Sequence, residues 1–342
     1  QPEVNAVKLA AEEINAKGGV LGKKLEIVIY DYKSRPEDAV NAVRRLIDHD
    51  KVIAILGSAS SGANIATAPL VNRAGIPQIG TLSTNPLVTV DEKGKVRPFM
   101  FRICFIDPYQ GRLIGYFAAK ELKKKKAAIL YDVGSDYSEG LKEFFVARFA
   151  ELGGELKGIW GFRSGDVDFR AQLTEMKASG AEAVALPLLY KEMGLIMKQA
   201  AELDWFPAFI GGDGFSPSMH EIAGEAMEGS YWVYNMDLLN PQMILLFSRF
   251  EKEYGRPVTE PSNVAYAYDL ITWVADAIRR AGTDDSTAIR DALEDTKDLR
   301  LVHFTLTVDK ETHNPLNKPA AMMVWKDQKL NFLEMWAPQD NF

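Results

Sequence analysis

The sequence predicts an α/β protein with parallel sheets that helices cover on both faces, organised as two domains. Short apolar runs typical of buried strands alternate with patterns of helical period over most of the chain. The 342 residues are more than a single hydrophobic core usually supports. With 47% hydrophobic and 25% charged residues, the composition is that of a folded globular chain and excludes intrinsic disorder.

The predicted elements follow from the spacing of apolar residues. The first helix has Val4, Val7, Ala11 and Ile14 on one face, and the Lys17-Gly18-Gly19 segment ends it. Further helices are predicted over 36–49, 62–73, 109–122, 138–152, 168–179, 192–203, 241–254, 263–281 and 285–295. Strands are predicted over 25–30, 52–56, 77–79, 127–131, 183–186 and 209–210, and in the tail over 304–309, 320–326 and 330–336.

The order of the first elements is unusual. The chain opens on a helix, whereas a domain with a doubly wound sheet usually opens on a strand. Either the fold begins differently, or the first strand and its loop are absent from this sequence. We expect that they are absent.

Charge and cysteine content exclude several classes of protein. The net charge of −7 provides no basic field for DNA or RNA, and the Lys123–Lys126 run is expected to be a solvated helix end. The sequence has no apolar run of about 18 residues, the length that a membrane span needs. The single cysteine, Cys104, excludes an internal disulfide and a cysteine-based zinc cluster, and we expect a buried thiol.

Catalytic motifs are absent from the sequence. We find no glycine-rich dinucleotide loop, no phosphate-binding P-loop and no nucleophile elbow. His220-Glu221 begins a zinc-helix pattern, but Gly224 stands where the second histidine would be required. The four histidines are dispersed along the sequence. We therefore expect a protein that is not an enzyme and that uses no metal or cofactor.

Polar segments follow the predicted strands, where parallel α/β sheets bind ligands. They cover 57–63, 80–86, 132–140, 187–193 and 211–215. Ser60 and Ser61 precede a helix, so their hydroxyls suit either an anion site or a simple N-cap. Together the segments offer hydroxyls, two tyrosines and one carboxylate flanked by glycines. This set complements a small zwitterion.

At these segments the chain resembles the branched-chain amino-acid-binding proteins, which are type I periplasmic solute-binding proteins of ABC importers. The similarity covers essentially the whole chain in order. It is carried by the segments 10–22, 30–31, 57–61, 74–77, 136–140, 211–214 and 266–269.

The resemblance implies two doubly wound parallel-sheet lobes joined by three hinge crossovers near 103–108, 234–240 and 310–318. The first lobe would comprise 1–104 and 237–314, and the second 105–236 and 315–342. The ligand would lie between the lobes. The implied ligand-binding residues are Ser61, Thr84 and the backbone of Leu82 at the α-carboxylate, Asp213 at the α-ammonium, and Tyr137 and Tyr190 as aromatic contacts. Ser83 is a further implied ligand-binding residue.

Two departures from the family pattern concern ligand choice. Leu82 stands where relatives usually have a smaller residue, a change that a backbone contact tolerates. The expected absence of the first strand and loop removes part of the side-chain pocket that relatives have.

The resemblance implies a periplasmic or other extracytoplasmic receptor, free or lipid-anchored, whose signal peptide is not in this chain. It would bind a small aliphatic α-amino acid and deliver it to an ABC permease as a monomer, without nucleic acid. Alternatives are a sensor of the same fold that binds an amide or an aromatic carboxylate, and an α/β enzyme. An export signal would favour transport, and an enzyme would need a nucleophile or an acid–base pair.

Overall fold

The chain folds into two compact units, each built from more than one segment. The structure, a computed structural model, describes residues 1–238 and 240–338. The first unit comprises Gln1–Phe105 and Leu238–Lys318, and the second comprises Ile106–Asp237 and Pro319–Phe342. The chain therefore passes between the units at 105/106, 237/238 and 318/319. Residues 315–318, expected in the second lobe, group with the first unit.

The first unit contains a parallel sheet whose strands lie in the order β1, β2, β3. Helices α2 and α3 pack together over it, and Val43, Ile55, Val71 and Met100 form the buried cluster between them. Its strands are β1 (Ile55–Leu56), β2 (Gln78–Gly80), β3 (Met100–Arg102), β9 (Leu299–Arg300) and β10 (Thr305–Leu306). Its helices are α1 (Pro2–Ala16), α2 (Pro36–Asp48), α3 (Ser61–Ala74), η1 (Pro86–Val88), α9 (Pro241–Tyr254), α10 (Pro261–Ala281) and α11 (Ser286–Glu294).

The strand predicted over 25–30 does not form, and those predicted over 52–56 and 304–309 shrink to β1 and β10. A cavity of about 610 Å³ accompanies this difference, lined both by residues 24–30 and by residues 50–58. A strand forms only where a neighbour accepts its hydrogen bonds. Residues 25–30 line this cavity and lie outside the sheet, and Val28 and Ile29 are exposed.

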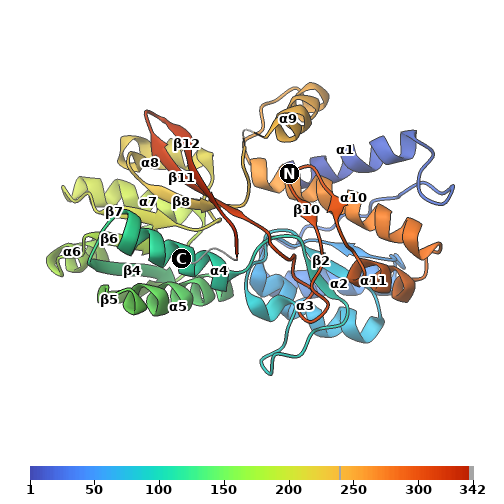
Figure 1. Cartoon of the computed structure of the whole chain (residues 1–342), viewed down its shortest axis with the longest axis horizontal. Helices are drawn as coiled ribbons and strands as arrows, with labels where there is room; N and C mark the ends of the chain where they lie inside the picture. Colours follow the sequence, from blue (N-terminus) through green and yellow to red (C-terminus); the bar gives the residue numbers. More distant parts are fainter. Residues whose placement is uncertain (239, 339–342) are drawn as a thin grey trace. The chain divides into compact units, whose positions relative to one another are not determined.

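The second unit is built on a seven-stranded sheet in the order β12, β11, β8, β7, β6, β4, β5. Strands β4 to β8 are parallel, and β11 runs antiparallel to both of its neighbours. Figure 1 shows α5 on one face of this sheet and α7 and α8 on the other. The predicted class of parallel sheets between helices is therefore confirmed.

The elements of the second unit differ from expectation at three places. Strands β5 and β8 were not predicted, and the helix expected over 109–122 ends at Tyr116 and continues as a π-helical turn. The strands are β4 (Lys126–Asp132), β5 (Glu155–Phe162), β6 (Ala183–Leu186), β7 (Ala208–Gly211), β8 (Tyr231–Tyr234), β11 (Ala320–Lys326) and β12 (Lys329–Trp336). The helices are α4 (Asp107–Tyr116), η2 (Phe117–Glu121), α5 (Asp136–Glu151), α6 (Arg170–Ala178), α7 (Tyr190–Glu202), η3 (Pro217–Met219), α8 (His220–Ala223) and η4 (Gly224–Met227).

A lysine is buried in the core of the first unit. Lys318 is 2% exposed, and its ammonium lies over the rings of Phe304 and Tyr266, at 4.8 and 5.8 Å from their centroids. Burial lowers the pKa of Lys318 to about 7, although the nearby Cys104 and Asp269 oppose the change. The fold therefore carries an amine whose charged form is costly in the native state.

We expect Lys318→Met to raise the free energy of unfolding most below pH 7, with a gain that shrinks as the pH rises toward 10. Between the folded pKa of about 7 and the unfolded value of about 10.4, the unfolded chain binds a proton that the folded chain lacks. Wild-type stability therefore rises with pH in this window, by up to about 1.4 kcal/mol per pH unit. Methionine has no charge to desolvate, so the variant lacks this slope.

Urea unfolding of both proteins across this pH range measures the difference. The exposed Lys297→Met variant is the control and should show no pH-dependent difference from wild type. A constant difference between Lys318→Met and wild type at all pH values would contradict the assignment.

Candidate functional site

In the first unit, the segment after β1 brings two serines to the start of α3. Ser60 is the N-cap, because its Oγ accepts the N–H of Ala63 at 3.4 Å. Ser61 is 3% exposed, and its Oγ accepts the N–H of Asn85 at 3.3 Å. The sequence left open which of the two serines caps α3, and the structure shows that it is Ser60. The Ser61 hydroxyl instead joins this segment to the one after β2.

Two buried amides that the sequence did not single out hold the segment after β1. Asn64 Oδ1 accepts from the backbone N–H of Ser58 at 3.1 Å and from Gln78 Nε2 at 2.6 Å. Asn64 Nδ2 donates to the Ser58 carbonyl at 2.8 Å. Because every donor in this group meets an acceptor, the polar segment stays ordered inside the unit.

The segment after β2 buries two hydroxyls. Ser83 and Thr84 are fully buried, and neither hydroxyl has a hydrogen-bond partner among the described residues, while Leu82 is half-buried. A methyl group on Gly80 would lie 2.1 Å from Ser83 Oγ, so the Ser83 side chain packs against β2. Buried hydroxyls without protein partners are uncommon. The hydroxyls of Ser83 and Thr84 are therefore buried groups for which the described residues supply no hydrogen-bond partner.

A buried guanidinium holds the same segment. Arg102, on β3, is fully buried and donates from Nη1 to the Ser83 carbonyl and from Nη2 to the Asn85 carbonyl, both at 2.7 Å. Nη2 also donates to Thr89 Oγ1 at 3.1 Å. The planar guanidinium presents its donors in a fixed fork, so one side chain holds several acceptors of the segment in a set geometry.

We expect Arg102→Met to lower the free energy of unfolding by roughly 3 kcal/mol or more, because it leaves buried carbonyls without donors. Arg97→Met is the matched control. Arg97 holds the same segment through the carbonyls of Leu87 and Val90, but it is half-buried, so water can replace it. Urea unfolding should show a clearly smaller loss for Arg97→Met, and equal losses would show that the buried fork has no special role.

In the second unit, Tyr137 and Asp213 lie together. Tyr137 is the second residue of α5, and its hydroxyl accepts the N–H of Gly214 at 3.2 Å and hydrogen-bonds the Asp213 carboxyl. Burial raises the pKa of Tyr137 well above its usual value, and the charges of Asp213 and Asp107 add to the rise. Tyr137 is therefore a neutral donor.

The Asp213 carboxyl follows β7 and is 8% exposed. It accepts from Gln110 Nε2 at 3.0 Å and from Asn235 Nδ2 at 3.2 Å. Burial raises the pKa of Asp213, and the hydrogen bonds from Gln110, Asn235 and Tyr137 oppose that rise. Sequence reasoning missed both amides, since Gln110 lies within a predicted helix and Asn235 is a single polar residue after an apolar stretch, and neither belongs to a motif.

The glycines on either side of Asp213 provide space for these contacts. A methyl group on Gly212 would lie 2.6 Å from Gln110 Oε1 and 2.7 Å from the Tyr137 hydroxyl. One on Gly214 would lie 2.2 Å from the Leu188 carbonyl, so the segment leading to Tyr190 packs against Gly214. Tyr190 is the first residue of α7 and is half-buried. The segments after β4, β6 and β7 thus meet at one edge of the sheet.

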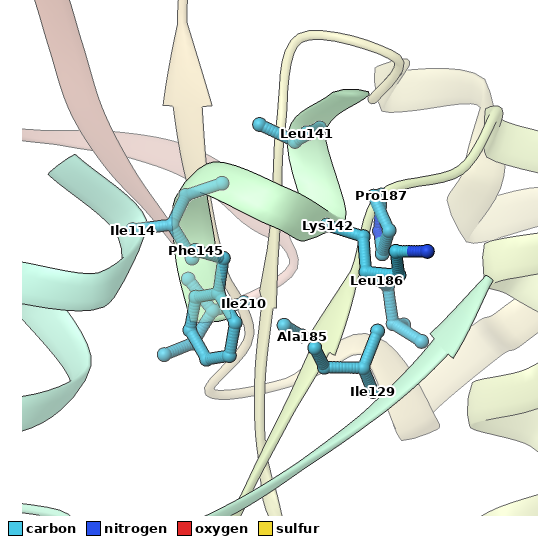
Figure 2. A pocket seen from close by; sticks show the side chains of 9 residues that line it. All are labelled: Ile114, Ile129, Leu141, Lys142, Phe145, Ala185, Leu186, Pro187 and Ile210. Carbon is cyan, nitrogen blue, oxygen red and sulfur yellow. The ribbon is translucent and has the colours of Figure 1, made fainter. Parts of the chain in front are cut away.

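Below this edge, core side chains of the second unit pack closely together. Figure 2 shows a small depression between α4, α5 and strands β4, β6 and β7. It holds no space for a water molecule. The depression is therefore part of the core and no ligand pocket. Its lining residues are Ile114, Ile129, Leu141, Lys142, Phe145, Ala185, Leu186, Pro187 and Ile210.

The chemistry that these residues can perform is recognition by charge and hydrogen bonding. Residues 1–238 and 240–338 contain no group of three or more His, Cys, Asp or Glu side chains that could hold a metal ion. Within the same ranges, no helix has the length and apolar character to cross a bilayer. Hydroxyl donors lie in the first unit, and a buried carboxylate with tyrosines lies in the second.

Several solved structures and curated sequences are similar to this chain over most of its length. A leucine-binding protein of Thermotoga maritima is 34% identical, with a TM-score of 0.91 over 99% of this chain and 94% of that chain. A branched-chain amino acid transporter substrate-binding protein of Streptococcus pneumoniae, solved with isoleucine, is 31% identical, with a TM-score of 0.90 over 98% and 94%. A leucine-, isoleucine-, valine-, threonine- and alanine-binding protein of Pseudomonas aeruginosa is 30% identical over 83% of this chain and 75% of that protein.

The family comparison covers nearly the whole chain. The model of a family described as periplasmic binding protein matches residues 1–329. The predicted type I fold is confirmed by the two solved structures above. Fold and family are those of substrate-binding receptors, and this chain belongs to the periplasmic binding protein family.

Proposed function

We propose that this chain is the extracytoplasmic receptor of an ABC importer and that it binds a small α-amino acid with an aliphatic side chain. The choice of ligand is based on one observation. The buried Asp213 carboxylate is surrounded by neutral donors, so a ligand cation is the group that would balance its charge. The named ligands of the relatives, leucine, isoleucine and valine among them, support an aliphatic side chain.

The two ends of the amino acid have complementary partners in the two units. Ser61, Thr84 and the backbone of Leu82 bind the α-carboxylate, and Ser83 contributes through the backbone of the same turn. Asp213 binds the α-ammonium, and Tyr137 and Tyr190 contact the ligand with their rings and hydroxyls. Contacts from both units would make ligand binding favour a closed arrangement.

The receptor changes no bond of its ligand and delivers it to a membrane permease. Both parts of this proposal are supported by membership of a family of substrate-binding receptors and by relatives named as components of transporters. The protein acts as a monomer in the periplasm or an equivalent extracytoplasmic space.

The ligand class is tested by a thermal-shift screen of the twenty amino acids and a set of aromatic carboxylates. We expect the aliphatic amino acids to raise the melting temperature, because a ligand that binds only the folded state stabilises it by mass action. Mass spectrometry should recover the bound amino acid unchanged. Stabilisation by aromatic carboxylates alone would favour the aromatic ligand, and chemical conversion would contradict a receptor.

We expect Asp213→Asn to weaken amino-acid binding by about 30-fold or more. Loss of one partner of a buried, hydrogen-bonded charge pair costs about 2–5 kcal/mol, and about 1.4 kcal/mol corresponds to tenfold in affinity. Ser61→Ala should be milder, because other donors to the carboxylate remain. Calorimetry measures both, and Asp166→Asn, which changes an exposed carboxylate of the same unit, is the control. Unchanged affinity in Asp213→Asn would refute an ammonium partner at this position.

Closure on the ligand is tested by small-angle X-ray scattering. If residues of both units contact one amino acid, saturating ligand should lower the radius of gyration of the wild-type chain. Asp213→Asn at the same ligand concentration should stay close to the free form. A radius of gyration that does not respond to ligand, in a protein shown to bind it, would contradict closure.

A further inference from the structure

Two buried side-chain amides orient the Asp213 carboxylate. Gln110 on α4 donates from Nε2 to Oδ1, and Asn235 directly after β8 donates from Nδ2 to Oδ2. Gln110 Oε1 also accepts the backbone N–H of Asp213 at 3.2 Å, so one side chain holds both the backbone and the carboxylate. The two amides and the Tyr137 hydroxyl supply three donors to the Asp213 carboxylate, which has about four acceptor sites, so one site is left for a further donor.

Gln110 also separates two carboxylates. Its Nε2 lies 3.0 Å from Asp107 Oδ1, and Asp107 is fully buried. An amide nitrogen carries two hydrogens, so Gln110 can donate one to each aspartate. Two titratable groups adjoin this cluster: Asp107 on α4, which bonds Gln110, and Tyr137 on α5, which is a neutral donor.

Both amides lie close to positions where the chain passes from one compact unit to the other. Asp107 and Gln110 follow the passage at 105/106, and Asn235 precedes the passage at 237/238. The orientation of Asp213 therefore depends on two of the segments that connect the units.

We propose that Gln110 and Asn235 are positioning residues that hold the Asp213 carboxylate toward the ligand ammonium. In this way they set the preference for an α-amino acid over the same carboxylic acid without its amino group. The inference rests on the proposed function. It adds to that function the residues that distinguish the ligand by its charge.

The hydrogen bonds to Asp213 predict how amino-acid binding depends on pH. Burial raises the pKa of Asp213, and the bonds from Gln110 and Asn235 lower it. A protonated Asp213 offers no negative charge to an ammonium. Loss of either amide therefore moves the acid limit of amino-acid binding to higher pH.

The test compares leucine with isocaproate, which is leucine without its amino group, by calorimetry from about pH 5 to about pH 8. Isocaproate binding is measured by displacement of leucine at millimolar concentration. Gln110→Met should weaken leucine binding about tenfold or more, leave isocaproate binding within about twofold, and move the acid limit for leucine to higher pH. Asn235→Leu should likewise weaken leucine binding, spare isocaproate binding and move the acid limit to higher pH, and it provides a second variant should Gln110→Met fold poorly.

Gln199→Met is the matched control. Gln199 is a buried glutamine of the same unit that bonds the backbone of Phe169 and Val167, so its loss reports the structural cost alone. Equal losses for leucine and isocaproate, or an acid limit that does not move in either amide variant, would overturn the positioning role. A wild-type chain that binds no amino acid would instead overturn the proposed function itself.

Discussion

A carboxylate taken out of water has to be surrounded by donors, and the edge of the second sheet is organised around this requirement at Asp213. Desolvation of one such ion costs several kcal/mol unless hydrogen bonds replace the lost water. Gln110 from α4, Tyr137 from α5 and Asn235 from the end of β8 supply these bonds. Gly212 leaves the space that Gln110 and Tyr137 occupy, and Gly214 leaves space for the backbone of Leu188.

The first unit has the opposite arrangement, a buried cation held by neutral acceptors. Arg102 binds the carbonyls of the segment after β2, and Ser61 receives the N–H of Asn85 in that same segment. Both units thus hold the segment after a parallel strand with polar groups from neighbouring elements.

The local pattern of apolar residues predicted most helices and strands. It failed where a strand lacked a neighbour to pair with or where glycines interrupted the pattern. The helix over 241–254 and the strands over 183–186 and 320–326 have the predicted bounds, because the helix has a clear helical period and each strand is a continuous apolar run. Residues 25–30 have an equally apolar pattern, yet they face a cavity and form no strand. Strand β5 was missed because Gly158 and Gly161 interrupt its apolar alternation. The ligand contacts at Ser61, Leu82, Ser83, Thr84, Tyr137, Tyr190 and Asp213 stay predictions.

The sequence by itself determined the α/β class, the family and the order of polar segments after strands, because these follow from periodicity and from motifs within short stretches. Only the tertiary structure decided that Ser60 caps α3 while Ser61 bonds the next segment, and that Gln110 reaches Asp213. Those two residues are 103 positions apart, and no local pattern relates them. They meet because the order of strands in the sheet places β7 beside β8 and α4 against both α5 and β8, a relation that exists only in the folded chain.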